Sequence, residues 1–347
     1  MVVDHRKIMS LGQSSKVISL PKLWLNINNL DQGNSVSVTI QKNGTLLVAP
    51  IGDFDEGIKK INLQIKADET EGSIIRKIIG AYLNGYTLVN LSSGNIFTMN
   101  QQQTIREIIR KLYMMIISSE TSRIELETLV DETKVSIPAS VDRMHMITYA
   151  MFRDIIRALK EENRSLALSV VSLEEDIDQM MYLIIRVLRS AVSTPVLANQ
   201  LELEPLDCLD YQTLIHRIER IADHLALIAE SIITVIDSGF KIPENVKNII
   251  LEAAGIIFET YEKTIDSFKH MDVEPTNMII DAQEQISDLF SKITPLPELS
   301  GVTDLAILSD IISIRENIKS ISNISADIAE LTIDRTYKSR EPAFYLE

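Results

Sequence analysis

The sequence has few of the residues on which secreted and membrane-embedded proteins depend. Its 347 residues contain one cysteine, Cys208, so no disulfide can form within the chain and we expect a reducing, cytoplasmic location. The most apolar run, Met180 to Val192, is interrupted by Arg186 and Arg189 and is shorter than the roughly 20 residues that a membrane helix needs. The charged first residues lead into no apolar stretch. We therefore expect neither a secretory signal nor insertion into a membrane.

Signatures of catalysis are missing as well. The chain has only 12 glycines and none of them cluster, so there is no glycine-rich loop to cradle a phosphate. Cys208 has no histidine in a recognisable arrangement, and no other pair of residues indicates a nucleophile and its base. We predict that the protein is not an enzyme. Aromatic residues make up only 5% of the chain, a bias that favours helix bundles over aromatic ligand pockets.

Positive charge is scarce overall but is concentrated at the N-terminus. The formal net charge is −15, which argues against broad nucleic-acid binding. Residues 1–50 nevertheless hold five basic and two acidic residues, a net charge of +3, which leaves −18 for the remaining chain. This asymmetry indicates a mildly basic head on an acidic body.

The head has the pattern of a small β-rich module. Ser35 to Ile40 alternates apolar and polar residues, Asn43-Gly44 is a strong hairpin signal, and Thr45 to Val48 fits the partner strand. Val17 to Leu20 is a further strand candidate, and Pro21 to Leu30 indicates a short helical segment. A unit of about 45 residues buries too little core to stand alone, so we expect it to dimerise.

The middle of the chain, residues 51–138, is expected to form an α+β linker domain. The predicted strands are Ile61–Ile65, Tyr86–Leu91, Arg123–Leu129 and Lys134–Ile137, and the predicted helices are Ser73–Leu83 and Gln102–Ile117.

From residue 139 onward the pattern is entirely helical. Six segments are predicted, near residues 141–162, 165–192, 208–238, 243–270, 275–293 and 303–334. The third segment carries an apolar seam with alternating steps of three and four residues, formed by Leu214, Ile218, Ile221, Leu225, Ile228, Ile232 and Val235. The tripeptide Ile-Ala-Glu ends both the third and the sixth segment, 100 residues apart. This repeat predicts two related three-helix bundles.

The sharpest chemical feature is a pair of carboxylates four residues apart on each of two helices. Glu219 and Asp223 share one helix face, and Glu174 and Asp178 repeat that spacing one helix earlier. Like charges at this spacing repel unless a cation lies between them, and a hard cation such as Mg, Mn or Fe suits oxygen ligands. His224 is a further possible nitrogen ligand. The alternative is an ordinary solvated face, because both carboxylates of the later pair lie off the apolar seam.

The basic residues of the head suggest contacts to DNA phosphates. The candidates are Arg6, Lys7, Lys16 and Lys22, and a dimer would set two such faces against one duplex. The alternative interpretation is an ordinary basic surface on a dimerisation module.

Two segments resemble known families. Gly12 to Trp24, with its Ser-Leu-Pro-Lys-Leu-Trp core, resembles the AbrB/SpoVT-type swapped-hairpin module, and Gly33 and the Asn43-Gly44 turn fit that pattern. Ile218-Glu-Arg-Ile-Ala-Asp-His224 and the acidic stretch Glu174 to Asp178 resemble PhoU, the phosphate-uptake regulator. The combination of the two modules is similar to archaeal PhoU-like regulators.

The resemblance implies an intertwined head dimer that binds DNA and tandem three-helix bundles with metal clusters on their outer surface. Carried over onto this chain, it makes Glu174, Asp178, Glu219 and Asp223 candidate ligands for iron, zinc or magnesium ions. At the 100-residue offset Glu219 corresponds to Lys319 and Asp223 to Asn323, so the second bundle lacks the later pair.

The domain boundaries and function follow as expectations. We expect an AbrB/SpoVT-like head at 1–50, the linker domain at 51–138, PhoU-like bundles at 139–238 and 239–335, and a tail at 336–347. The expected function is that of a dimeric, phosphate-responsive transcriptional regulator. The alternative is an adaptor that docks a phosphate transporter or signalling kinase without binding DNA.

Overall fold

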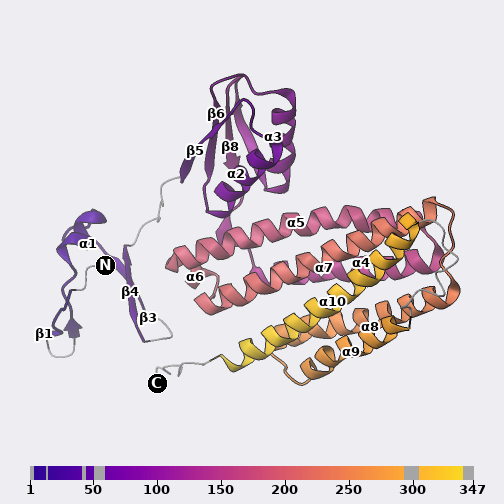
Figure 1. Cartoon of the computed structure of the whole chain (residues 1–347). Helices are drawn as coiled ribbons and strands as arrows, with labels where there is room; N and C mark the ends of the chain where they lie inside the picture. The colour runs from indigo at the N-terminus through magenta and orange to yellow at the C-terminus, as the bar shows by residue number, and fades with distance from the viewer. Residues whose placement is uncertain (1–3, 13–14, 41–43, 51–58, 293–304, 339–347) are drawn as a thin grey trace. The chain divides into compact units, whose positions relative to one another are not determined.

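The computed structural model describes residues 4–12, 15–40, 44–50, 59–292 and 305–338. It divides into two compact units, a small one with the N-terminal elements and a large one that spans Lys59–Lys338. The fold class expected from the sequence is confirmed, because a small β-rich region, an α+β segment and a long helical region follow one another along the chain (Figure 1).

The small unit, called the head here, consists of two separate strand pairs and one short helix. Its elements are β1 Met9–Leu11, β2 Ser15–Val17, α1 Lys22–Ile27, β3 Val36–Ile40 and β4 Leu46–Pro50. β1 pairs with β2 and β3 with β4, both antiparallel. The expected strand Val17–Leu20 is wrong in position, because β2 ends at Val17. Asn43 of the expected turn lies outside the described residues, and Gly44 adopts a positive φ of 76° that suits glycine.

The head buries very little of its own apolar surface. Among its described residues only Ala49 is a buried hydrophobic residue. Large apolar side chains are instead exposed, namely those of Ile8, Met9, Leu11, Ile18, Leu23, Ile27, Val38, Ile40 and Leu46. So small a unit with so much exposed apolar surface needs a partner surface to be stable.

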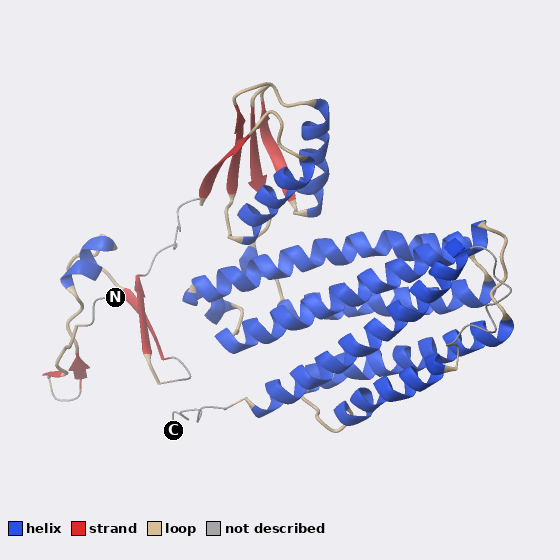
Figure 2. Cartoon of the chain, viewed as in Figure 1, coloured by secondary structure: helices blue, strands red, loops and turns tan. Residues whose placement is uncertain are grey.

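The large unit begins with a four-stranded sheet covered by two helices. Its elements are β5 Lys60–Ile65, α2 Glu71–Leu83, β6 Leu88–Ser93, α3 Met99–Lys111, β7 Met114–Ser119 and β8 Arg123–Thr128. The strand order is β5-β6-β8-β7, with β5 parallel to β6 and the other neighbours antiparallel. Both helices lie on the same face of the sheet (Figure 2). Alternate strand residues such as Val89, Leu91 and Leu126 are buried beneath them.

Two predictions in this region are wrong. The segment Gln102–Ile117 is not one helix, because α3 ends at Lys111 and Met114 begins β7. Tyr113 between them has a φ of 49°, a left-handed conformation that stops a helix. Lys134–Ile137 is not a strand either. Glu132–Lys134 is a 3₁₀ turn, and the Ser136 hydroxyl accepts a hydrogen bond from the Ala139 N–H at the start of the next helix.

In its described residues, the helical region contains the six predicted long helices and one short helix that was not predicted from the sequence. They are α4 Ile137–Glu161, α5 Arg164–Ser193, α6 Pro195–Gln200, α7 Pro205–Asp237, α8 Glu244–His270, α9 Thr276–Ser291 and α10 Leu305–Tyr337. Pro195 indicated a break in the sequence, but proline is well suited to the first turn of a helix, and α6 begins there.

The long helices form two three-helix groups with one continuous core. Helices α4, α5 and α7 pack together, as do α8, α9 and α10, and the groups join where α7 packs on α10 and α4 on α8. The predicted seam of α7 is buried along its whole length, from Leu214 to Val235. Each such buried aliphatic side chain contributes about 1.5 to 3 kcal/mol relative to exposure. This packing fixes α5 against α7 and so sets the position of every side chain along their shared margin.

Helix α5 also holds the C-terminal ends of α2 and α3. The buried Arg186 guanidinium donates to the carbonyls of Tyr82 and Tyr86 and forms an ion pair with Glu132, with an Nε–Oε1 distance of 2.6 Å. Gln179 Nε2 donates to the Arg110 carbonyl at the end of α3, at 3.0 Å. The last carbonyls of a helix lack partners within the helix, so the Gln179 amide provides a donor for the Arg110 carbonyl at the end of α3. The Tyr82 carbonyl accepts from the Gly85 N–H as well as from Arg186.

A search of the helices in the described part of the chain found none with the length and apolar content to cross a membrane. Cys208 is a buried free thiol near the start of α7.

Candidate metal centre

The two carboxylate pairs lie on facing helices along the margin of their packed interface. Glu174 and Asp178 are one turn apart on α5, and Glu219 and Asp223 are one turn apart on α7. The neighbouring residues Ile177 and Ala222 are fully buried in the core. All four carboxylates are half-buried rather than fully solvated. Packing of the apolar seam therefore brings the two carboxylate pairs close together and leaves one side of the group open to water.

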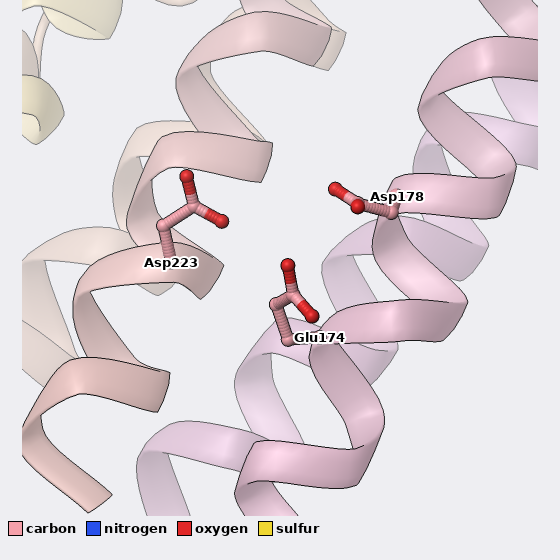
Figure 3. A group of neighbouring side chains, drawn as sticks. All are labelled: Glu174, Asp178 and Asp223. Carbon is pink, nitrogen blue, oxygen red and sulfur yellow. The ribbon is translucent and has the colours of Figure 1, made fainter. Parts of the chain in front are cut away.

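Three of these carboxylates converge. Glu174, Asp178 and Asp223 each place a carboxylate oxygen within 4.8 Å of the others. Figure 3 shows the three side chains pointing toward one another from two helices. We call Glu174, Asp178 and Asp223 the acidic cluster.

Each member of the acidic cluster is held in a setting that disfavours its charge. Burial raises the pKa of Glu174, and repulsion by Asp178 and Asp223 adds to the shift. Burial also raises the pKa of Asp178, with the Asp223 charge adding to it and the Lys111 ammonium opposing it. The pKa of Asp223 is likewise raised by burial, against the charges of His224 and Arg220. Desolvated carboxylates with raised pKa values gain stability when a cation joins them.

Glu219 lies beside the acidic cluster without being one of the three that converge. Burial, followed by the charges of Asp223, Asp178 and Glu174, raises its pKa to about 7. A carboxylate with this pKa is about half protonated at neutral pH. The structure therefore brings three of the four sequence-predicted ligands into one group and places the fourth close enough to feel their charge.

Two of the basic side chains near the cluster contact residues on α10 rather than its carboxylates. Arg217 pairs with Asp327 on α10, with Nη1 and Oδ2 2.7 Å apart. His224 Nδ1 lies 2.7 Å from Asn317 Oδ1, so that ring nitrogen is engaged with α10. Arg217 therefore contributes to the contact between the two helix groups rather than to an ion pair with the acidic cluster.

Two residues near the cluster were not predicted from the sequence. Lys111 at the end of α3 lies 3.5 Å from Glu175 and acts electrostatically on Glu174 and Asp178. Nothing in the sequence could signal this contact, which joins residues more than 60 positions apart through tertiary packing. Tyr182 has its pKa raised by burial and by the surrounding carboxylates. Tyr182 lies one turn after Asp178 on the same helix face, so helical spacing alone could have predicted its place beside the cluster.

The donor set fits a divalent cation. Oxygen atoms bound to one Mg²⁺ or Ca²⁺ lie at most about 4 to 5 Å apart, twice a bond length of about 2.0 to 2.6 Å. The oxygens of the acidic cluster lie within 4.8 Å of one another, a span that an ion with bonds near the longer end of this range can bridge directly. Three carboxylates on one side and open solvent on the other leave positions for water or an anion. All ligands offered are oxygens, which favours hard cations such as Mg²⁺, Mn²⁺ or iron over soft ones.

The second helix group carries a lysine and an amide, Lys319 and Asn323, where α7 carries Glu219 and Asp223. Asn323, which corresponds to Asp223, accepts a hydrogen bond of 3.0 Å from Gln283 of α9. Glu284 and Asp288 keep the four-residue spacing and border an open hollow with Glu252 and Asp281. Among the described residues, the acidic cluster of the first group is the only set of three potential metal ligands that meets.

The four candidate DNA-binding residues are all exposed on the head. Arg6 pairs with Asp4, and Lys16 Nζ donates to the Ser10 hydroxyl at 2.9 Å across the β1–β2 pair. Lys7 precedes β1 and Lys22 is the first residue of α1, and both side chains are exposed.

Two parts of the chain match known protein families. Residues 141–232 match the PhoU domain family, and residues 11–55 match the family described as antidote-toxin recognition MazE, bacterial antitoxin. The helical fold is similar to the crystal structure of PhoU from Pseudomonas aeruginosa, with a TM-score of 0.51 and 16% identity. That similarity covers 57% of this chain and 93% of the other. A comparison with curated proteins found no match.

The PhoU match contains α5 and most of α7 and thus all four carboxylates, and the MazE match covers the head from Leu11 onward. The chain therefore carries a MazE/AbrB-like domain at its N-terminus followed by a PhoU domain.

Proposed function

We propose that this protein is a cytoplasmic, phosphate-responsive transcriptional regulator rather than an enzyme. Its head would dimerise and bind DNA, and its helical body would bind a divalent cation at the acidic cluster. The observation that carries the proposal is the convergence of Glu174, Asp178 and Asp223 inside the segment that matches the PhoU domain, on a chain that begins with a MazE/AbrB-like domain.

The dimer is supported by the exposed apolar surface of the head. Its strand pairs each consist of two strands, so both pairs present free edges to a partner. A second copy of the head offers apolar surface of the same kind and would cover both the edges and the exposed side chains. A swapped dimer of residues 1–50 also doubles the number of basic residues facing a duplex.

The metal centre supports a role in sensing. A bound cation would dominate the local charge and present an open coordination position to an anion such as phosphate or a partner's carboxylate. Glu174, Asp178 and Asp223 would hold the cation, and Glu219 would stand beside it as a further oxygen donor. We propose domains at 1–50, 51–138, 139–238 and 239–335, with a tail at 336–347.

A fluorescence-anisotropy titration tests the DNA-binding half of this proposal. The probe is duplex DNA from upstream of the protein's own gene and of phosphate-transport genes, at two salt concentrations. We expect sequence-selective binding that weakens with added salt and with Lys16→Ala and Lys22→Ala together, because each lost phosphate contact reduces counterion release. The matched control is Lys241→Ala with Lys263→Ala, which removes the same charge from the helical region. Equal weakening in both double variants would contradict phosphate contacts by the head.

A second candidate function is an adaptor that docks a phosphate transporter or a signalling protein. The net charge of −18 outside the head favours it, because that surface suits basic protein partners. Absence of DNA binding at low salt would select this function, with the head serving only to dimerise.

A further inference from the structure

The acidic cluster has a counter-ion that comes from another part of the large unit. Lys111 is the last residue of α3, in the α+β segment, and its Nζ lies 3.5 Å from Glu175 Oε1 on α5. Its charge acts on Glu174 and Asp178, whereas Arg220 and His224 act from the α7 side on Asp223. Lys111 is thus a basic residue of the sheet-and-helix segment whose charge acts on the two carboxylates of α5.

The Lys111 contact is the exchangeable part of a wider attachment. Arg186 is buried, and its guanidinium is fixed by Glu132 and by the carbonyls of Tyr82 and Tyr86. The side chains of Lys111 and Glu175 are instead 35% and 67% exposed. An exposed lysine holds its partner weakly and can exchange with ions from solvent. The end of α2 is therefore firmly bound to α5, and the end of α3 is held in part by a weak ionic contact.

We propose that Lys111 is an exchangeable counter-ion of the acidic cluster, so that a divalent cation bound there and the contact of the α3 end with α5 oppose each other. The inference rests on the cation binding proposed above. A divalent cation between Glu174, Asp178 and Asp223 cancels most of the negative charge that attracts the Lys111 ammonium, and the two cations repel each other. By linkage, any ligand or partner that draws the α3 end away from α5 raises the cation affinity by the same factor.

This antagonism gives the α+β segment a role in setting cation affinity. While Lys111 stays beside the acidic cluster, a bound cation lies close to a second positive charge. Cation binding therefore either displaces the Lys111 ammonium or takes place against its repulsion. A unit charge close to a divalent ion at a protein surface changes affinity by about three- to tenfold. The contact between Gln179 and the Arg110 carbonyl carries no charge and is expected to remain.

Isothermal titration of the full chain with Mn²⁺ tests the affinity. Lys111→Gln should bind Mn²⁺ about three- to tenfold more tightly than the wild type, and Lys111→Glu more tightly still. Arg106→Gln is the matched control, because it removes the same charge from an exposed position on the same helix. Equal affinities for wild type and Lys111→Gln would overturn the inference while leaving the metal site standing. Absence of Mn²⁺ binding to the wild type would overturn both.

Hydrogen exchange provides a readout that is independent of affinity. Mn²⁺ should accelerate exchange of the backbone amides in the last turn of α3, residues 108–112, in the wild type. In Lys111→Gln the same amides should exchange at one rate with and without the ion. Unchanged or slower exchange in the Mn²⁺-bound wild type would contradict the proposed antagonism.

Discussion

Replacing Arg186 with methionine should loosen the C-terminal end of α2 from α5. The variant keeps the aliphatic volume but removes the ion pair to Glu132, the hydrogen bonds to the Tyr82 and Tyr86 carbonyls and the cation–π contact, 4.8 Å from the Tyr82 ring centroid. Breaking a buried ion pair costs about 3 to 5 kcal/mol. Glu132 is 17% exposed and stays partly solvated after the change, so we expect the lower end, about 3 kcal/mol.

Native-state hydrogen exchange followed by mass spectrometry measures this cost locally. A loss of about 3 kcal/mol corresponds to a roughly 100-fold faster exchange of the most protected α2 amides. Arg189→Met is the matched control. Arg189 lies one turn further along α5 and donates to the Leu83 carbonyl and to Asn84, but it is exposed. We expect its loss to cost less than about 1 kcal/mol.

The comparison of the two arginine variants decides whether burial makes the difference. Similar acceleration in Arg186→Met and Arg189→Met would refute the reasoning, because the contacts alone would then account for the effect. A change below about tenfold in Arg186→Met would show that the α+β segment is held mainly by apolar packing around Tyr182.

Two further predictions concern acid stability and assembly. Burial opposes ionisation of Glu69, but hydrogen bonds from Lys77, Ser73 and the Lys66 N–H outweigh it and lower its pKa to about 2. The ionised form of Glu69 therefore stabilises the fold fully above the unfolded pKa near 4.5, and this stabilisation is lost as the pH falls toward 2. Glu69→Gln should accordingly reduce the difference in melting temperature between pH 7 and pH 3. In the head, Ile27→Lys should convert a dimer to a monomer by light scattering, whereas Leu168→Lys on α5 should not; an unchanged mass would contradict the apolar interface.

The helical region could be predicted from the sequence because the spacing of its apolar residues matches the positions that are buried. The α7 seam repeats over seven positions, and tertiary packing buries each of them as the pattern predicts. The carboxylate pairs off that seam were visible for the same reason. The four-residue spacing placed each pair on one face of its helix. It could not show that the pair on α5 lies opposite the pair on α7.

Short apolar runs gave the wrong answers. Met114 to Ile117 follows a helix without any glycine or proline to mark the boundary, and only Leu112 and the left-handed Tyr113 separate α3 from β7. Val135 and Ile137 looked like a strand because two alternating apolar residues fit either structure. The N-cap at Ser136 was the signal that decided for a helix.

Contacts between distant segments could not be predicted at all. Lys111 and Arg186 reach their partners through the docking of the α+β segment on α5, which no local pattern encodes. The loss of the second carboxylate pair was visible as Asn323, and the structure adds its partner Gln283.

The most direct test of the account is a Mn²⁺ titration of the acidic cluster by isothermal calorimetry. The test variant carries Asp178→Asn and Asp223→Asn, and the control carries Asp176→Asn and Glu230→Gln, which remove the same charge from exposed positions on the same two helices. We predict that wild type and control bind Mn²⁺ alike and that the test variant binds at least about tenfold more weakly. Equal weakening in both variants, or no binding to the wild type, would contradict a metal centre at these residues.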